Sequence, residues 1–370
     1  MMTPLRPSGA AAVPKLVERP APRRKGSDKA PLYAALDLGT NSCRMLIARP
    51  DGAQFRIVDS FSKSVQLGVG LESSGKLSRA SMARTVQAMR ICKQKLKKHG
   101  VKRMKLVATE ACRRAGNAQD FIRYIKRETG LSLDIIAPEE EARLAVISCA
   151  PLVSRKTEQL LVVDIGGGST ELVWIDLSQV EPNSRAQAIM ALHQGFEFAG
   201  GARVVDWISV PLGVATLREQ FSDVADDAAC FALMSWFFEE NLAPFAPYAE
   251  EQSREGFQII GTSGTVTTVA ASHLGLRRYD RSKVDGMRMT SDEIDAVIRD
   301  YLSMGPEGRR NDPRIGRDRH ALIMSGSAIL QALLRSWPTD RLSVADRGLR
   351  EGLLYAQMSQ DGVLEDVTYG

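Results

Sequence analysis

The sequence has no long hydrophobic run. None of its apolar segments approaches the ~18 residues that a membrane-spanning helix needs. The beginning of the chain lacks the apolar stretch of ~7 to 15 residues that marks a secretory signal, and we find no lipidation motif. These absences predict a soluble cytoplasmic protein with no membrane partner.

Cysteine and histidine are scarce and scattered. The five cysteines include no CxxC pair, which argues against a zinc site or a disulfide framework. The four histidines include no HExxH pattern, which argues against a histidine-bound metal. A GxxxxGK motif is also absent, so the P-loop fold is excluded. The cysteines are best interpreted as small buried hydrophobic residues.

The excess of positive charge is confined to one end of the chain. The 49 basic and 44 acidic residues give a net charge of +5, but residues 1–30 alone account for this excess. That segment is also rich in proline and has no apolar periodicity, which predicts a disordered tail. The rest of the chain is balanced in charge and gives no indication of a nucleic-acid partner.

The chain contains one strand, turn and strand pattern twice. The clearer copy spans 160–175, LLVVDIGGGSTELVWI, in which Asp164 ends an apolar run. The stretch 33–48, YAALDLGTNSCRMLIA, aligns with it without a gap at an offset of 127 residues, so that Asp37 corresponds to Asp164. Such internal similarity predicts two related domains.

The chain is also longer than one domain usually is. Its 370 residues exceed the common ~100 to 200 per domain. We therefore expect a duplicated α/β fold with domains at 33–141 and 142–370, a cleft between them, and a last helix that packs back on the first domain. Periodicity and capping residues predict helices at 78–99, 117–128, 139–149, 214–221, 225–241, 292–301, 321–334 and 349–358, and further strands at 101–109, 133–136, 207–211 and 257–260.

Three turns rich in glycine and hydroxyl groups follow strands. They span 37–42 (DLGTNS), 164–170 (DIGGGST) and 261–268 (GTSGTVTT). Backbone N–H groups and hydroxyls in such turns can surround a phosphate. The same residues are common in ordinary tight turns, but three such turns, two led by aspartate, favour phosphate binding. The candidate phosphate ligands are Gly39, Thr40, Asn41, Ser42, Gly166, Gly167, Gly168, Ser169, Gly264 and Thr265.

Six segments resemble, in the same order, the exopolyphosphatase and guanosine pentaphosphate phosphatase family. They are DLGTNS, ATEACRRAGN, PEEEARLAV, DIGGGSTEL, GTSGTVTT and GLREGLL. That family belongs to the actin, sugar kinase and Hsp70 superfamily, so the resemblance implies two actin-like, ribonuclease H-like domains. It also implies Mg²⁺-dependent removal of terminal phosphates from inorganic polyphosphate or guanosine pentaphosphate.

The resemblance also implies roles for four acidic residues. Glu141, which directly precedes Ala-Arg, corresponds to the family's catalytic glutamate, which would deprotonate the attacking water. Periodicity alone does not distinguish it from Glu140, and the three glutamates of this helix start would also suit a solvent-exposed first turn. Asp164 and Asp37 would bind Mg²⁺. Glu171 corresponds to a third acidic residue of the family.

The arginine assignments also depend on the resemblance. Arg113 matches the family pattern TxAxRxAxN and would bind phosphate oxygens, with Arg44 and Arg114 as further candidates. The basic residues of 93–105 and 309–319 would suit a long polyanion, although a solvated surface is the interpretation that such residues favour.

Three functions follow from these observations. The first is an exopolyphosphatase that uses activated water. The second removes the 5′ terminal phosphate of guanosine pentaphosphate, would also bind guanosine tetraphosphate, and would act in the stringent response. The third, of another class, is an actin-like or Hsp70-like nucleotide-binding module. The segments around Glu141 and Arg113 favour the phosphatases, and we expect a homodimer.

Overall fold

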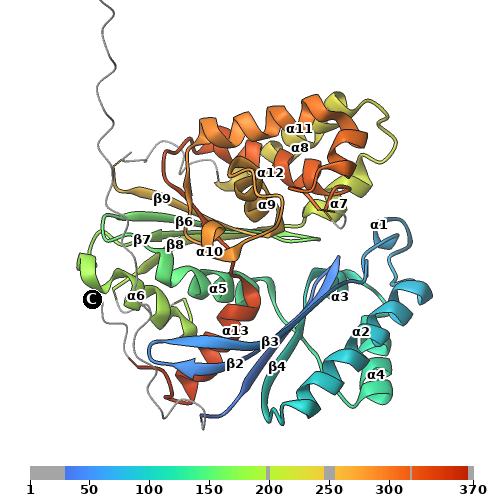
Figure 1. Cartoon of the computed structure of the whole chain (residues 1–370), viewed down its shortest axis with the longest axis vertical. Coiled ribbons are helices and arrows are strands. Elements are labelled where there is room, and N and C mark those ends of the chain that lie inside the picture. The colour runs from blue at the N-terminus through green and yellow to red at the C-terminus, as the bar shows by residue number, and fades with distance from the viewer. Residues whose placement is uncertain (1–29, 197–200, 246–254, 317–318, 366–370) are drawn as a thin grey trace, which may run out of the picture.

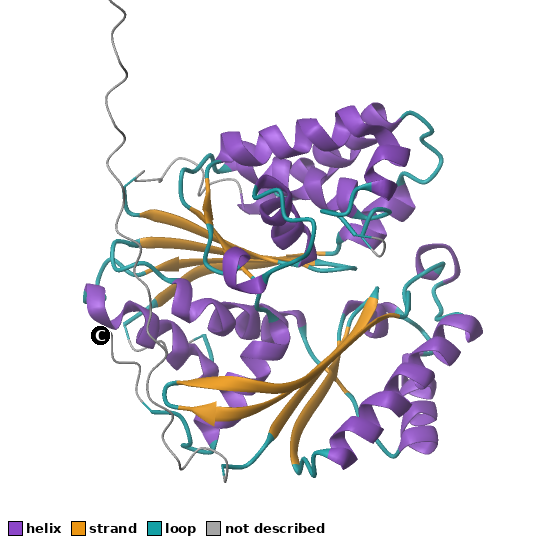
Figure 2. Ribbon diagram, in the orientation of Figure 1, coloured by secondary structure: helices purple, strands orange, loops and turns teal. Residues whose placement is uncertain are grey.

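The computed structural model describes residues 30–196, 201–245, 255–316 and 319–365. The predicted tail therefore lies almost entirely outside the described residues. Within them the chain forms two β-sheets, each flanked by helices, with two further helices between the sheets (Figures 1 and 2).

The first sheet is built from the beginning of the chain. Its first three strands are antiparallel neighbours, the fourth pairs with the first in parallel, and the fifth pairs with the fourth in parallel. Helices α2 (Arg79–Lys98) and α4 (Ala118–Thr129) cover one face, and short helices α1 (Leu71–Ser74) and α3 (Glu110–Arg114) lie in the connections (Figure 1). The strand order is β3 (Gln54–Ser64), β2 (Ser42–Asp51), β1 (Tyr33–Leu38), β4 (Arg103–Ala108) and β5 (Asp134–Ile135).

The second sheet has the same arrangement at its centre, where an antiparallel hairpin is extended by parallel strands. Its order is β10 (Arg288–Met289), β11 (Leu342–Ala345), β9 (Phe257–Thr262), β6 (Gln159–Ile165), β7 (Thr170–Asp176) and β8 (Arg203–Val210). The helices that cover its outer face are α7 (Val214–Gln220), α8 (Asp227–Asn241), α9 (Gly264–His273), α11 (Ser291–Asn311) and α12 (Ile323–Ser336) (Figure 1).

Two helices lie between the sheets (Figure 1). Helix α5 (Pro138–Cys149) leads from the first sheet to the second, and α13 (Leu349–Gln360) returns to pack on β1 and β2. The smaller helix α6 (Arg185–Ala191) lies beside these two helices. The short helix α10 (Arg281–Val284) lies beside the second sheet. A Cβ atom on Gly352 of α13 would lie 2.0 Å from the carbonyl oxygen of Leu144 in α5. The glycine therefore permits the close crossing of these helices.

The two hairpins that share a sequence pattern also share their hydrogen bonding. Asp37 pairs with Arg44 in one hairpin, and Asp164 pairs with Glu171 in the other. In both, the amide of the first turn glycine donates to the carbonyl of the serine three residues later, at 3.0 and 2.9 Å. The duplication predicted from the sequence is thus present in the backbone.

Some elements differ from the sequence prediction. The strand expected at 207–211 is the longer β8, and β3 was not predicted because its alternating residues are largely exposed and polar. The helix expected to end at residue 301 continues as α11 to Asn311, with a kink at Gly305, whose φ is 64°. At its start Thr290 and Glu293 form a capping box with two hydrogen bonds of 2.9 and 3.1 Å.

Candidate active site

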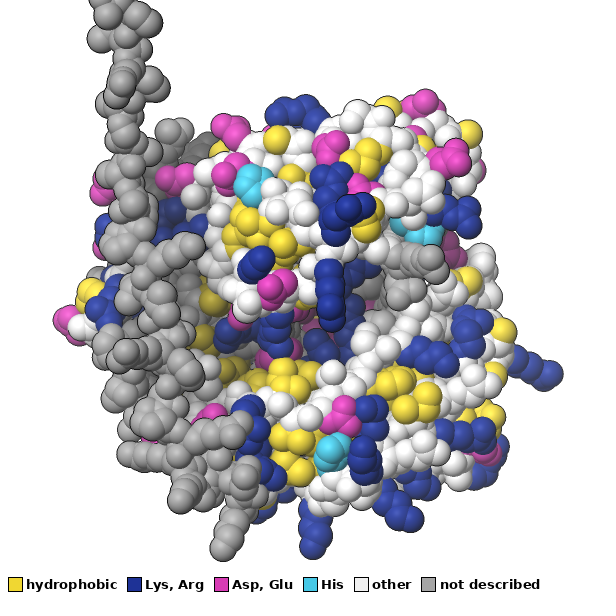
Figure 3. Space-filling view, viewed as in Figure 1, with side chains coloured by type: hydrophobic (Ala, Val, Ile, Leu, Met, Phe, Trp, Pro, Cys, Tyr) yellow, Lys and Arg dark blue, Asp and Glu magenta, His cyan; other side chains and the backbone are white. Residues whose placement is uncertain are grey.

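A cavity lies between the two sheets, and its walls come from both halves of the chain. Figure 3 shows a hollow at this place, with basic and acidic side chains gathered inside it. All three predicted turns line the cavity, as do Asp37, Glu141 and Asp164. Residues that are far apart in the sequence are therefore brought together around one space.

The first two turns touch each other across the cavity. A Cβ atom on Gly168 would lie 2.4 Å from Oγ1 of Thr40, and one on Gly167 would lie 3.2 Å from the amide nitrogen of Asn41. Any larger residue at 168 would have to displace the opposite turn. The glycines thus allow backbone from both domains to approach the same ligand.

Carbonyl groups of these turns accept hydrogen bonds from the protein, whereas several of the turn amides donate none to the described residues. Gly166 and Gly167 accept hydrogen bonds from the first amides of α7, at 3.0 and 2.8 Å, and the carbonyls of Thr40 and Asn41 accept from the chain at 65–68. Within the described ranges the amides of Thr40, Asn41, Gly167, Gly168 and Ser169 donate to no protein group. Unpaired N–H groups that line a cavity form an anion-binding concavity.

Asp37 and Asp164 stand at corresponding ends of β1 and β6, beside these turns. Neither carboxylate accepts a hydrogen bond or forms an ion pair in the described part of the chain. Burial, followed by the charges of Glu141 and Asp37, raises the pKa of Asp164 to about 8. Burial also raises the pKa of Asp37, against the attraction of Arg44.

These two carboxylates fit a small divalent cation. Mg²⁺ usually takes one or two carboxylates and completes its coordination with water and phosphate oxygens. A cation there would supply the positive charge that these two buried acids lack. No cluster of three or more His, Cys, Asp or Glu side chains suited to a metal occurs among the residues that the structure describes.

Glu141 is the one glutamate of its helix start that is buried. Its exposed fraction is 8%, whereas Glu139 is exposed and Glu140 partly exposed. Burial, and then the charge of Glu171, raise the pKa of Glu141 well above its usual value, while Arg113 lowers it. A carboxylate with a raised pKa that lines a cavity is suited to accepting a proton.

Arg113 lies behind Glu141 and is not among the residues that line the cavity. Its Nη1 donates to Oε2 of Glu141 at 2.6 Å and to the carbonyl of Ile136 at 3.1 Å, and its Nε donates to Glu110 at 2.9 Å. The predicted contact between Arg113 and phosphate stays untested. The arrangement favours a different task, which is to hold the two glutamates in place.

Glu171 is also behind the cavity wall. It is 2% exposed, and its Oε1 accepts hydrogen bonds from the hydroxyls of Ser169 at 2.7 Å and Ser209 at 2.9 Å. Burial, and then the charge of Asp164, raise the pKa of Glu171 to about 7. Glu171 is therefore not an exposed charge, and its contact with Ser169 supports a role in orienting that turn.

The third turn begins α9 and is joined by two arginines. Oγ of Ser263 accepts from the amide of Val266 at 3.1 Å and caps the helix. A Cβ atom on Gly264 would lie 3.9 Å from Nη2 of Arg44 and from Cζ of Arg319. One guanidinium from each domain therefore reaches the N-terminus of α9, which itself favours an anion.

The Arg44 guanidinium donates no hydrogen bond within the described residues. Burial, and then the like charges of Arg350 and Arg319, lower its pKa, although Asp37 opposes them. Converging arginines of this kind are stabilised by a bound anion. The sequence named Arg44 as a secondary candidate and assigned no role to Arg350, which lies in the GLREGLL segment used only for the resemblance.

Of the basic residues predicted to suit a polyanion, Arg319 lines the cavity, whereas two others pair elsewhere. Arg309 is buried against Asp227, with Nη2 at 2.6 Å from Oδ1, and Arg314 is paired with Asp312. Sequence reasoning also did not identify Glu110 and Asp346 as cavity residues. Glu110 begins the short helix α3 and Asp346 directly follows β11, and neither belongs to a repeated pattern, so only the tertiary structure reveals them.

The chain is similar in sequence to a known family over most of its length. A profile of the Ppx/GppA phosphatase family matches residues 46–361. Two curated proteins, from Aeromonas hydrophila subsp. hydrophila and Aeromonas salmonicida, are each 28% identical over 332 residues and are named guanosine-5'-triphosphate,3'-diphosphate pyrophosphatase. The alignments cover 90% of this chain and 60% of each relative, so the chain spans about three fifths of their length.

Solved structures are similar over nearly their whole length. A Ppx/GppA family member from Aquifex aeolicus is 29% identical, with a TM-score of 0.70, and the match covers 90% of this chain and 98% of the other. An exopolyphosphatase from Cytophaga hutchinsonii has a TM-score of 0.75, and the match again covers 90% of this chain and 98% of the other. At 22% identity this similarity supports the fold only. The predicted fold class, two actin-like α/β domains around a cleft, is confirmed.

Proposed function

Because the chain belongs to the Ppx/GppA phosphatase family, we propose that it is an exopolyphosphatase that releases the terminal phosphate of inorganic polyphosphate. The observation that carries the proposal is the position of Glu141, a buried carboxylate in a cavity that is also lined by unpaired amides, by arginines, and by Asp37 and Asp164. Family membership supports phosphatase activity over the alternative of a nucleotide-binding module alone.

The reaction is an in-line attack of water on the terminal phosphorus. The water oxygen forms a bond to phosphorus, the bond to the bridging oxygen breaks, and its electron pair leaves with the shortened polyphosphate. Glu141 Oε1 or Oε2 takes the proton of the water, for which its raised pKa is suited. Arg113 holds that carboxylate in a fixed orientation.

The transferred phosphoryl group is bound by backbone amides of the turns at Thr40–Asn41 and Gly167–Ser169. These donors are already arranged before the substrate arrives, and such preorganised groups stabilise a developing charge without reorganisation. Arg44, Arg319 and Arg350 then neutralise the phosphates of the leaving chain. Mg²⁺, when held by Asp37 and Asp164, would reduce the repulsion between carboxylates and substrate.

The test is phosphate release from polyphosphate, guanosine pentaphosphate and ATP, with and without Mg²⁺. We expect release from polyphosphate that requires Mg²⁺ and falls at least ~100-fold in Glu141→Gln, because general-base catalysis contributes ~10² to 10⁴-fold. Glu140→Gln, one residue away and not in the cavity, is the control and should retain activity. Release that survives in Glu141→Gln would show that another group activates the water.

A second candidate substrate is guanosine pentaphosphate. The names of the two Aeromonas relatives favour it, and its terminal phosphate would undergo the same chemistry in the same cavity. A higher kcat/KM for guanosine pentaphosphate than for polyphosphate would establish it as the preferred substrate. The predicted homodimer and cytoplasmic location stay predictions; no helix in the described ranges is long and apolar enough to span a membrane.

A further inference from the structure

A second glutamate lines the cavity beside Glu141, and the proposed reaction assigns it no task. Glu110 is the first residue of α3 and is only 8% exposed. A buried carboxylate is costly unless it is paired, and one that faces phosphate groups also repels them. Substrate binding therefore does not explain why this side chain stands in the cavity wall.

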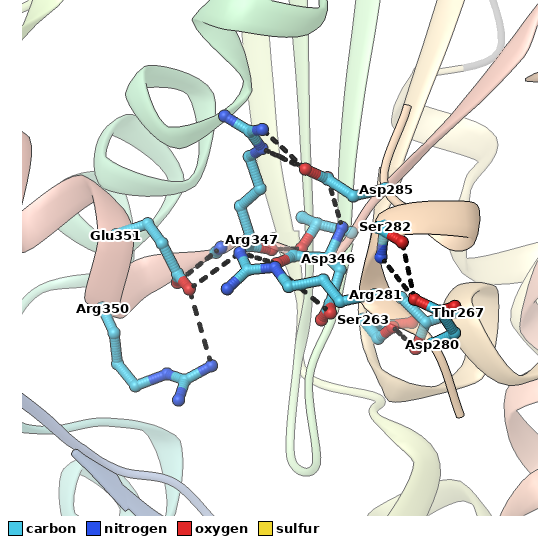
Figure 4. A network of polar contacts seen from close by, with 12 residues as sticks. Ser263, Thr267, Asp280, Arg281, Ser282, Asp285, Asp346, Arg347, Arg350 and Glu351 are labelled. Atoms are coloured by element: carbon cyan, nitrogen blue, oxygen red, sulfur yellow. Dashed lines mark hydrogen bonds and ion pairs between the residues drawn. The ribbon is translucent and has the colours of Figure 1, made fainter. Parts of the chain in front are cut away.

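Other acids near the cavity belong to a separate network, which includes Asp285, Asp346 and Glu351 (Figure 4). Arg347 binds the first of them, with Nη2 at 2.6 Å from Oδ2 of Asp285. Nε of Arg281 lies 3.5 Å from Oδ2 of Asp346. These contacts stabilise the chain around the start of α13. Glu110 differs from these acids, because the arginine that it binds also binds the proposed catalytic base.

This arginine, Arg113, is shared between Glu110 and Glu141. Its Nε donates to Oε2 of Glu110 at 2.9 Å, and its Nη2 lies 2.8 Å from the same oxygen. The remaining nitrogen, Nη1, donates to Oε2 of Glu141 at 2.6 Å and to the carbonyl of Ile136 at 3.1 Å. A guanidinium is planar and rigid, so holding the edge formed by Nε and Nη2 also fixes the direction of Nη1.

Glu110 also touches the phosphate turn of the second domain. A Cβ atom on Gly168 would lie 2.9 Å from Cγ of Glu110 and 3.1 Å from its Cβ, so the side chain of Glu110 packs directly on this glycine. One side chain of the first domain thus supports the turn at 166–169 and, through Arg113, the start of α5. The proposed base and the proposed phosphate ligands share this support.

We propose that Glu110 is a positioning residue for the phosphatase reaction, which holds Arg113 so that its Nη1 points at the Glu141 carboxylate. The inference rests on the proposed function, because it takes Glu141 as the base that accepts the proton of the attacking water. Without Glu110, one edge of the Arg113 guanidinium loses its partner, and Glu141 loses its fixed orientation. The expected effect is on the chemical step, with substrate binding nearly unchanged.

The first test compares phosphate release from polyphosphate in Glu110→Ala and Glu110→Gln. Alanine removes both contacts with Arg113, so we expect kcat to fall about tenfold or more, with KM within about twofold of the wild type. Glutamine keeps an oxygen that can accept from Nε, so its kcat should stay within about threefold of the wild type. A folded Glu110→Ala with the kcat of the wild type, or one in which KM alone changes, would overturn the proposal.

The control for these variants is Glu72→Ala. Glu72 is an exposed acid that pairs with the neighbouring Arg114 and does not line the cavity. Both kcat and KM should stay at their wild-type values in this variant.

A double-mutant cycle shows whether Glu110 acts through Arg113. If it does, Glu110→Ala should lower kcat by less than about twofold in a protein that already carries Arg113→Ala, because residues that act as one unit are not additive. Losses that multiply, as they do for independent sites, would mean that Glu110 acts by another route and would refute the positioning role.

The NMR signal of the Arg113 Nε–H group reports the same contact without turnover. In the full chain we expect a signal that exchanges slowly with water, because the group is buried and donates to a carboxylate. Its absence in Arg113→Ala assigns it. The signal should be lost in Glu110→Ala and persist in Glu72→Ala.

This measurement separates the two hypotheses. An unchanged Arg113 signal in Glu110→Ala, when the wild type releases phosphate, refutes the positioning role alone. Loss of the signal in Glu110→Ala, when the wild type releases no phosphate from polyphosphate, guanosine pentaphosphate or ATP, refutes the proposed activity alone.

Discussion

Arg113 holds two glutamates of the cavity wall at once. Its Nη1 donates to Glu141 at 2.6 Å, and its Nη2 lies 2.8 Å from Oε2 of Glu110. The side chains of Arg113 and Glu141 are 13% and 10% exposed, so water screens their attraction little. The pKa and the orientation of the proposed catalytic base therefore both depend on this arginine.

Arg113→Ala should lower kcat and leave KM nearly unchanged. Arg113 lowers the pKa of Glu141, which burial raises, so its removal leaves Glu141 protonated over more of the pH range. We expect kcat to fall ~10 to 100-fold at neutral pH and the acidic limb of the pH–kcat profile to move to higher pH. Arg114→Ala is the control, because Arg114 pairs with the exposed Glu72. An unshifted pH profile with a higher KM would instead indicate that Arg113 binds phosphate.

Asp164→Asn should stabilise the protein at high pH when Mg²⁺ is absent. Burial, with the charges of Glu141 and Asp37, raises the pKa of Asp164 to about 8 from an ordinary 3.8. The folded state thus holds a proton that the unfolded state releases above about pH 4, and wild-type stability falls as the pH rises towards 8.

Thermal unfolding with a chelator measures this difference. Above pH 8 we expect a melting temperature at least ~2 °C higher in Asp164→Asn than in the wild type, and the difference should vanish near pH 4. Added Mg²⁺ should stabilise the wild type more than the variant. A constant difference between the two proteins at every pH would contradict the assigned pKa.

Gly168→Ala should impair catalysis because the two phosphate turns would be forced apart. The new Cβ would lie 2.4 Å from Oγ1 of Thr40 and 2.9 Å from Cγ of Glu110. We expect kcat/KM for phosphate release to fall at least tenfold, since small displacements of catalytic groups are costly. Gly116→Ala is the control, because its nearest neighbour would be at an ordinary 3.6 Å. Equal activity of the two variants would show that contact between the turns is unimportant.

Gly352→Ala should destabilise the contact between α13 and α5. Its Cβ would lie 2.0 Å from the carbonyl oxygen of Leu144, so the helices would have to separate. We expect the free energy of unfolding in urea to fall by about 1 to 3 kcal/mol, the range for overpacked sites. Ser359 lies on the same helix, and its side chain forms no hydrogen bond with the residues that the structure describes, so Ser359→Ala should change the free energy of unfolding by less than about 0.5 kcal/mol.

Local sequence signals predicted the elements that depend on neighbouring residues. Ser78 caps α2 through its side chain, the Thr290 capping box is present, and both aspartate-led hairpins form as their pattern indicates. Strand β3 was not predicted, because an exposed edge strand has no apolar run and is held by pairing with β2. This pairing depends on the neighbouring strand and not on the sequence of β3 alone.

The sequence by itself determined the duplicated hairpins, the three turns and the places of Asp37 and Asp164, because each depends on a few adjacent residues. Only the tertiary structure decided which glutamate after Pro138 faces the cavity, since burial of Glu141 depends on how α5 packs between the sheets. It also decided that Arg113 binds glutamates and that Arg44, Arg319 and Arg350 converge. Those side chains are far apart in the sequence, and they come together only when the two domains fold onto each other.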